Sequence, residues 1–233
     1  MDTQATVNNA IEIRVITEDM VEESLEFLKT NFYPHEPVRR SLENGGPYFV
    51  DRFTKNYIGK GYSIAAVDTS TNQIVGIRIG KVVTADDWVG RAMNSLVGRK
   101  AMCLLNDVTH TPHTMDIYYQ RRQRLGFDVY RLMDRLKAKR VYVGSGVCTA
   151  PTHRAAGLAT KLVAKSIEVA KEDGCEYMYL TVSGNFSAKL YDRLGFSVEG
   201  ELDYDTFVDE KGERLLKDTR EHTKSQVRLK KLE

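Results

Sequence analysis

The residues most able to do chemistry lie in a stretch of mostly small side chains, RAAGLA, at positions 154–159. It lies between a strand-like run and an amphipathic pattern, so we expect it to begin a helix. Small side chains let a ligand approach the backbone, where unpaired N–H groups and the helix dipole attract an anion. The stretch matches neither a dinucleotide fingerprint nor a P-loop. It therefore predicts either a pyrophosphate site or only a tightly packed helix start.

A second segment, NFSAKLYDRLGF at positions 185–196, follows a run that is typical of a buried strand. Together with the RAAGLA stretch, it resembles the GCN5-related N-acetyltransferase (GNAT) superfamily. In that family an Arg/Gln-x-x-Gly-x-Gly/Ala loop binds the pyrophosphate of acetyl-CoA, and a second motif forms the helix and strand that follow. The positions of the second motif are held here by Asn185, Ala188, Tyr191, Gly195 and Phe196.

The resemblance implies an α/β fold, with a single GNAT domain over residues 11–232 after a flexible tail at 1–10. Its central sheet would be mixed but mostly antiparallel and flanked by helices, with a helical insert between the third and fourth strands. It also implies acetyl-CoA as the co-substrate, without a metal. The residues expected to bind acetyl-CoA are Val147, Cys148, Thr149, Arg154, Ala155, Ala156, Gly157, Leu158, Ala159 and Asn185.

A narrower resemblance concerns the segment FYPHEP at positions 32–37. It is similar to the aromatic-x-x-x-Glu-Pro segment of the insect-type arylalkylamine N-acetyltransferases, which act on dopamine and serotonin. In that subfamily the glutamate is the general base toward the amine, which implies this role for Glu36. On the same basis Ser183 and Ser187 are expected as catalytic residues beside the substrate, and Phe32 and Tyr33 as substrate-binding residues. The chain departs from the subfamily in its long insert over 84–138 and in Tyr191, where those enzymes often lack tyrosine.

The chemistry of amine acetylation asks for a base, an acid and a donor for the thioester carbonyl. The amine arrives mostly protonated at neutral pH, and Glu36 is the candidate to remove its proton. A leaving thiolate with a pKa of about 8.5 can take a proton from a tyrosine with a pKa of about 10, which makes Tyr191 the candidate acid. A strand N–H near Val147 or Cys148 would support the developing negative charge. Direct attack is a problem of proximity, so no covalent intermediate is required.

Each of these residues also has a purely structural interpretation. Glu36 could be a first-turn acid that the helix dipole favours. Tyr191 could be a core residue with a satisfied hydroxyl, and Cys148 a small buried hydrophobe. Arg140 and Arg154 are further candidates to reach the CoA phosphates.

The elements that must position these residues follow from hydrophobic periodicity. Strands are expected at 11–16, 62–68, 74–83, 140–149, 177–182 and 223–232. Helices are expected over about 20–28, from 36 onward, as one or two helices within 115–136, and at 157–171 and 186–194. This alternation of strands and helices indicates one α/β domain.

The 233 residues carry 34 basic and 32 acidic side chains, for a net charge of +2, and 42% are hydrophobic. This balance excludes a disordered chain and gives no reason to expect nucleic acid, and no apolar run is long enough to cross a membrane. Without a secretory signal at its start, the chain is expected in the cytoplasm. Cys103, His110 and His113 form an incomplete metal-ligand set. The basic residues Arg121, Arg122 and Arg124 are expected on a solvated helix face.

The sequence therefore predicts an acetyl-CoA-dependent N-acetyltransferase that acts on a small primary amine, with an arylalkylamine favoured. The alternatives are a polyamine or amino-sugar N-acetyltransferase, a protein N-acetyltransferase, and a CoA-binding sensor without catalysis. The expected partner is the small-molecule amine, with neither nucleic acid nor membrane, and the protein is expected as a monomer or homodimer.

Overall fold

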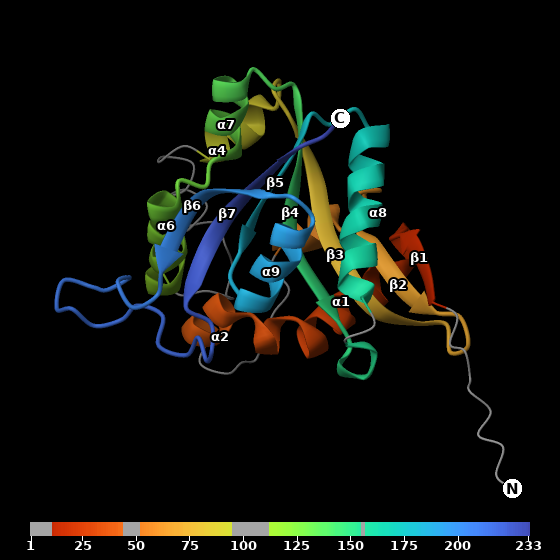
Figure 1. Cartoon of the computed structure of the whole chain (residues 1–233), viewed down its shortest axis with the longest axis horizontal. Helices are drawn as coiled ribbons and strands as arrows, with labels where there is room; N and C mark the ends of the chain where they lie inside the picture. The colour runs from red at the N-terminus through yellow and green to blue at the C-terminus, as the bar shows by residue number, and fades with distance from the viewer. Residues whose placement is uncertain (1–10, 44–51, 95–111, 155–156) are drawn as a thin grey trace, which may run out of the picture.

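The computed structural model describes residues 11–43, 52–94, 112–154 and 157–233, which form a seven-stranded sheet with helices on both faces (Figure 1). The tail predicted at 1–10 lies outside the described residues. The strands are β1 (Ile11–Val15), β2 (Ile64–Asp68), β3 (Gln73–Thr84), β4 (Arg140–Thr149), β5 (Tyr177–Val182), β6 (Ser197–Asp203) and β7 (Lys224–Lys231). They lie in the order β1-β2-β3-β4-β5-β7-β6, and only the β4–β5 pair is parallel. This is the expected mixed, mostly antiparallel sheet.

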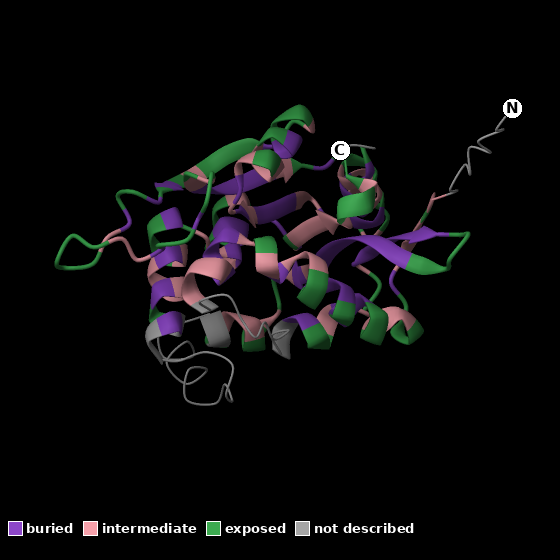
Figure 2. Cartoon of the chain, turned by 90° about the horizontal axis from the view of Figure 1, so that it is seen from below, coloured by how far each residue is buried: buried purple, intermediate pink, exposed green. Residues whose placement is uncertain are grey.

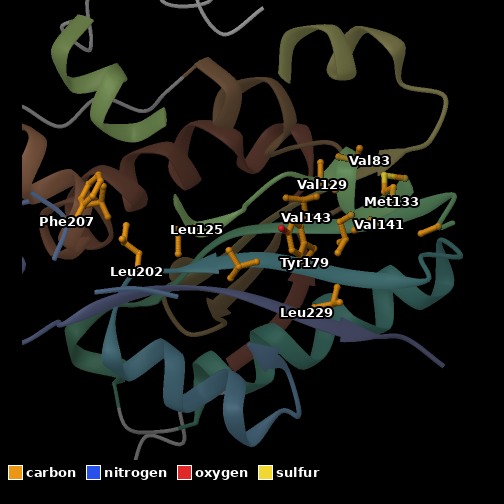
Figure 3. Packing of buried hydrophobic residues seen from close by; sticks show 14 of the residues in the cluster. Val83, Leu125, Val129, Met133, Val141, Val143, Tyr179, Leu202, Phe207 and Leu229 are labelled. Atoms are coloured by element: carbon orange, nitrogen blue, oxygen red, sulfur yellow. The ribbon is translucent and has the colours of Figure 1, made fainter. Parts of the chain in front are cut away.

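The helices divide between the two faces of this sheet. One face carries α8 (Leu158–Glu172) and α9 (Asn185–Arg193), and the other carries α1 (Val21–Asn31), α6 (Pro112–Leu125) and α7 (Val129–Leu136). Alternate side chains of a strand point to opposite faces. Accordingly, Tyr142 of β4 packs with residues of α8 and α9, whereas Val141 and Val143 pack with residues of α6 and α7 (Figure 3).

Short elements complete the fold. They are the helices α2 (Pro37–Glu43), α3 (Arg52–Tyr57) and α4 (Trp88–Asn94) and the 3₁₀ turns η1 (Glu18–Met20), η2 (Tyr33–His35) and η3 (Pro151–His153). Seen from below, the strands between the helix layers are largely buried, while most helices expose an outer side (Figure 2). No helix in the described ranges is long and apolar enough to cross a bilayer.

The helical insert between β3 and β4 is confirmed by α4, α6 and α7. The sequence left one or two helices open over 115–136, and the turn at Gly126 makes them two. Gly126 has a φ of +67°, a conformation that favours glycine. Asp128 then caps α7, because its carboxylate accepts hydrogen bonds from the backbone N–H groups of Tyr130 and Arg131 at 3.1 and 3.2 Å.

Strand β6 was not among the predicted strands. It is the edge strand next to β7, and most of its residues are exposed, so its SVEGELD sequence shows little hydrophobic alternation. Gly200 within it has a packing reason. A Cβ atom at this position would lie 2.3 Å from the carbonyl oxygen of Leu125, so glycine lets the end of α6 approach the sheet.

Strands β4 and β5 separate before either of them ends. They pair from Val141 with Tyr177 to Gly144 with Leu180, yet β4 continues to Thr149 and β5 to Val182. The β3–β4 register also shifts between Ile79 and Gly80, at the same level. Beyond Gly144 the edge of β4 that faced β5 pairs with no strand in the described part of the chain, so its backbone groups are available to a ligand. This opening is where the candidate site lies.

Candidate functional site

A cavity of about 790 Å³ opens beside the end of β4, between η2 and the first turns of α8 and α9. The residues predicted from the sequence that line it are Phe32, Glu36, Val147, Cys148, Thr149, Arg154, Gly157, Leu158, Ala159, Ser183 and Ser187. Tyr33 lines an adjoining cavity instead, and Ala155 and Ala156 lie outside the described residues. The fold thus brings most of the predicted residues to one place.

The first turn of α8 forms the cavity wall that suits an anion. Gly157 is the N-cap residue of α8 with a φ of +70°, and a Cβ atom there would meet no atom of the described residues within 4 Å. The backbone is therefore open to a ligand at the positive end of the helix dipole. Four cationic side chains line the same cavity: Arg154, Lys189, Arg193 and Arg220. The described lining residues include two carboxylates, Glu36 and Glu221.

Arg140 lies away from this wall. It begins β4 at the end opposite to Thr149, and its guanidinium forms an ion pair with Asp173, just beyond the C-terminus of α8. The structure therefore assigns Arg140 a structural ion pair, and Arg154 is the one of these two arginines that lines the cavity.

Val147 and Cys148 lie on the part of β4 that has lost its β5 partner. Burial raises the pKa of the Cys148 thiol to about 12. A thiol this weakly acidic stays protonated at neutral pH, which makes it a poor nucleophile. The raised pKa argues against a covalent acyl-enzyme at Cys148, although the residue is half-buried and lines the cavity.

Glu36 lies between the end of η2 and the beginning of α2. Its Oε2 accepts a hydrogen bond of 2.6 Å from the backbone N–H of Arg39, which caps α2. Glu36 therefore has the structural role expected of an acidic residue at the beginning of a helix. The second oxygen, Oε1, makes no hydrogen bond to a described residue, so the side chain can cap the helix and still accept a proton from a ligand.

A smaller cavity of about 170 Å³ adjoins the first, and Phe32, Glu36 and Ser183 line both. Phe32 reaches this junction by packing against β4, where a Cβ atom on Gly146 would lie 2.8 Å from its ring. Tyr33 also lines the smaller cavity, and the guanidinium carbon of Arg39 lies 3.9 Å from the centroid of its ring. Glu36 thus lies where the two cavities meet.

The predicted serines lie on this junction and on the α9 side. The carbonyl oxygen of Ser183 accepts a hydrogen bond of 2.7 Å from the Tyr204 hydroxyl. The Ser187 hydroxyl donates to the carbonyl oxygen of Gly184 at 2.9 Å, within the first turn of α9. Both serines line the larger cavity.

Asn185 and Tyr191 line neither cavity. The Asn185 amide binds the turn before β7, donating to Glu221 O at 2.8 Å and accepting from Thr223 N at 3.4 Å. Tyr191 is 2% exposed and packs edge-on against Phe196. Burial raises the pKa of its hydroxyl, which makes no hydrogen bond to any described residue. Asn185 therefore supports a loop, and the acid role of Tyr191 stays a prediction.

The prediction that Arg121 lies on a solvated helix face is wrong. Arg121 is 6% exposed and lines the smaller cavity, whereas Arg124 on the same helix is exposed. The signal was present in the sequence, since Arg121 lies four residues from both Ile117 and Leu125. Residues four apart share one helix face, and both of these neighbours are buried.

The histidines of the larger cavity were not predicted either. His222 accepts a hydrogen bond of 3.3 Å at Nδ1 from the backbone N–H of Asn185, so its proton is placed on Nε2. Its ring meets Phe186 edge-on at 5.7 Å between centroids. Burial, together with Arg154, Arg220 and Arg40, lowers the pKa of His35 below its ordinary value of 6.5. No group of three or more metal-ligating side chains occurs within the described ranges.

Comparison with known proteins finds a family match and several solved structures with a similar fold. Residues 102–196 match the Acetyltransferase (GNAT) family. A mosquito arylalkylamine N-acetyltransferase like 5b shares 23% identity with a TM-score of 0.75, over 96% of this chain and 100% of that one. Arylalkylamine N-acetyltransferase 2 of Aedes aegypti shares 20% identity with a TM-score of 0.80, over 97% and 100%. The Drosophila melanogaster polyamine N-acetyltransferase, which forms N-acetylagmatine, shares 15% identity with a TM-score of 0.75, over 96% and 100%.

These three structures share the fold of the whole described chain, and the family match falls on the segment that carries both sequence motifs. The family match and the shared fold agree with the resemblance drawn from the sequence and with the expected enzyme class, an acyltransferase.

Proposed function

We propose that this protein transfers the acetyl group of acetyl-CoA to a small primary amine, with residues 11–232 acting as one catalytic domain. The observation that carries the proposal is one cavity that is lined both by the N-terminus of α8 with four cationic side chains and by Glu36. An anionic cofactor and a protonated amine would need these two environments.

The residues of the larger cavity fit acetyl-CoA. The open backbone at Gly157 and the cations Arg154, Lys189, Arg193 and Arg220 match a pyrophosphate, which carries negative charge. The unpaired edge of β4 near Val147 offers backbone groups to an extended chain and to a carbonyl oxygen. When bound, acetyl-CoA supplies an acetyl thioester whose carbonyl carbon can accept an amine.

Glu36 is proposed to take the ammonium proton at Oε1 while Oε2 keeps its bond to the Arg39 backbone. The neutral amine nitrogen then forms the new N–C bond as the C–S bond breaks and its electron pair leaves with sulfur. The thiolate takes a proton from Tyr191 or from water, and the second amine proton returns to solvent. Holding both reactants on either side of Glu36 supplies the proximity that this reaction needs.

An arylalkylamine is the proposed substrate class of the larger cavity. Phe32 lines both cavities, and its ring lies tilted against Tyr33 at 5.5 Å between centroids, which gives the entrance an aromatic wall. A polyamine is the second candidate, because one neighbour of the same fold acts on agmatine. The described lining residues contain few carboxylates, and additional ammonium groups would need them.

The test is thiol release from acetyl-CoA by the full chain against tryptamine, dopamine, spermidine, glucosamine and a peptide. We expect tryptamine or dopamine to give the highest kcat/KM of this panel. Highest turnover with spermidine, glucosamine or the peptide would contradict the arylalkylamine class. CoA binding by calorimetry without turnover of any amine would indicate a CoA-binding sensor.

A further inference from the structure

The smaller cavity carries an unusual set of charges for an amine site. Two arginines line it, Arg39 and Arg121, which are 7% and 6% exposed. Glu36 is the one carboxylate among its described lining residues. The remaining polar lining consists of hydroxyl groups from Tyr33, Thr54, Tyr118, Ser145, Thr181 and Ser183. An ammonium group placed against Glu36 would therefore leave Arg121 without a counter-charge in this cavity.

Arg121 is the more informative of the two arginines. Its Nε donates a hydrogen bond of 3.0 Å to the Ser225 hydroxyl, and its guanidinium has no further hydrogen bond or ion pair with a described residue. A buried guanidinium ordinarily pairs with an acid, because burial without one is costly. Arg121 thus presents a nine-tenths buried cation with terminal donors that nothing in the described protein neutralises.

A hydrogen-bond network holds Arg121 in this position. The Ser225 hydroxyl that accepts from Arg121 lies 2.7 Å from the Tyr204 hydroxyl, which donates to the carbonyl oxygen of Ser183. Tyr204 has a single proton to donate, so Ser225 donates to Tyr204. Ser225 and Tyr204 are both fully buried. The network joins α6, β7 and the end of β5, so Arg121 and Ser183 face one cavity with fixed positions.

Glu36 and Arg121 line the same small cavity, so one bound molecule can meet both side chains. The volume of about 170 Å³ is close to that of cavities that hold benzene, about 150 Å³. A molecule of this size that places an ammonium group at the Glu36 carboxylate and a carboxylate at the Arg121 guanidinium is a short amino acid.

We propose that the amine substrate carries a carboxylate, that Arg121 binds this carboxylate, and that Glu36 faces its ammonium group. A guanidinium fork matches a carboxylate with two parallel hydrogen bonds, which gives both affinity and orientation. The inference rests on the proposed function, since it names the substrate class of the same site. It places simple arylalkylamines and polyamines second to amines that bear an acid group.

The test compares β-alanine with β-alaninamide, which differ in the charge of the distal group. We expect the wild-type protein to acetylate β-alanine with a kcat/KM about tenfold or more above that of β-alaninamide. In Arg121→Gln this ratio should fall about tenfold or more, and Arg121→Lys should restore part of it. Arg124→Gln, an exposed change on the same helix, should leave the ratio as in wild type.

Calorimetric binding of N-acetyl-β-alanine in the presence of CoA gives a readout without turnover. Arg121→Gln should weaken this binding about tenfold or more, while affinity for CoA alone stays unchanged. Acetylation of tryptamine but not of β-alanine by wild type would overturn this inference and leave the proposed function standing. A wild-type ratio near one, or an unchanged ratio in Arg121→Gln, would also overturn it. Failure with every amine, including tryptamine and spermidine, would overturn both.

Discussion

The proposed CoA end of the cleft comes largely from one continuous part of the chain, whereas the proposed amine end is assembled from segments far apart in sequence. The first uses the end of β4 and the beginnings of α8 and α9, within residues 147–193. The second uses η2 and α2, α6, and the end of β5. Local motifs can specify the first region, while tertiary packing alone specifies the second. The substrate can therefore change in such a fold while the cofactor site is kept.

The largest effect is expected where the two regions meet, at Glu36. Glu36→Gln keeps an amide oxygen for the Arg39 backbone N–H but cannot take the ammonium proton. A general base contributes about 10²–10⁴-fold, so kcat/KM for the amine should fall by that factor at about pH 7. The deficit should shrink as pH approaches the pKa of the amine, because more of it is then already neutral. Pre-steady-state acetyl transfer over about pH 7 to 9.5 measures this.

Two controls separate chemistry from structure in this variant. CoA affinity should match wild type, and thermal unfolding should show that the cap of α2 is retained. A deficit that stays constant with pH would mean that Glu36 positions the amine without taking its proton. A wild-type rate at every pH would mean that Glu36 serves only to cap α2.

A change at the beginning of α8 is expected to weaken binding at the proposed CoA end. Gly157→Val places a branched side chain in the open space expected for a phosphate, so CoA affinity should fall about 10- to 100-fold. The matched control is Gly174→Val near the other end of α8, where φ is +72° and a Cβ atom also meets nothing within 4 Å. Both variants carry the same backbone strain, so a loss of CoA affinity in a folded Gly174→Val would refute the assignment.

A smaller effect is expected at Tyr191, which lies outside both cavities. Tyr191→Phe should lower kcat by about three- to tenfold with both KM values nearly unchanged, since a thiol with a pKa of about 8.5 leaves with little help. The hydroxyl makes no hydrogen bond to a described residue, so the melting temperature should not change. Steady-state kinetics with unaltered kcat would assign Tyr191 to the core alone.

The smallest effect is a change in the titration of His35. Burial and the nearby Arg154, Arg220 and Arg40 disfavour its charged form, so in the free protein its pKa should lie below 6.5. CoA phosphates near Arg154 would offset part of this positive charge and raise the pKa. An NMR titration with and without CoA, assigned with His35→Gln, measures the shift. A fall on CoA binding would place the phosphates elsewhere.

The sequence predicted most of the residues that line the proposed CoA end, because its signals there are local. Gly157 and Leu158 of the RAAGLA stretch begin α8 and line the cavity, and six of the seven described strands were predicted from alternating or β-rich runs. Glu36 was found by a resemblance in its immediate neighbours. Asn185 shows the limit of such carry-over, since its side chain binds the 221–223 turn instead of facing the cavity.

The proposed amine end was harder to predict because its residues are far apart in sequence and come together only in the folded structure. Arg121 was assigned to solvent on the composition of its neighbours, although its spacing from Ile117 and Leu125 indicated the buried face. Its neighbour Ser225 lies on β7, 104 residues along the chain. Edge strand β6 was not predicted from the sequence, because an exposed edge strand needs no hydrophobic alternation.

The most direct test of the central claim follows both products of one reaction, the thiol and the N-acetylated amine, in the wild-type protein. The substrates are acetyl-CoA with tryptamine and, separately, with β-alanine, and mass spectrometry identifies the acetylated amine. A cleft that joins the two reactants at Glu36 predicts one thiol released for each amine acetylated, with both products slowed together in Glu36→Gln. Thiol release without an acetylated amine, or tight CoA binding without either product, would contradict it.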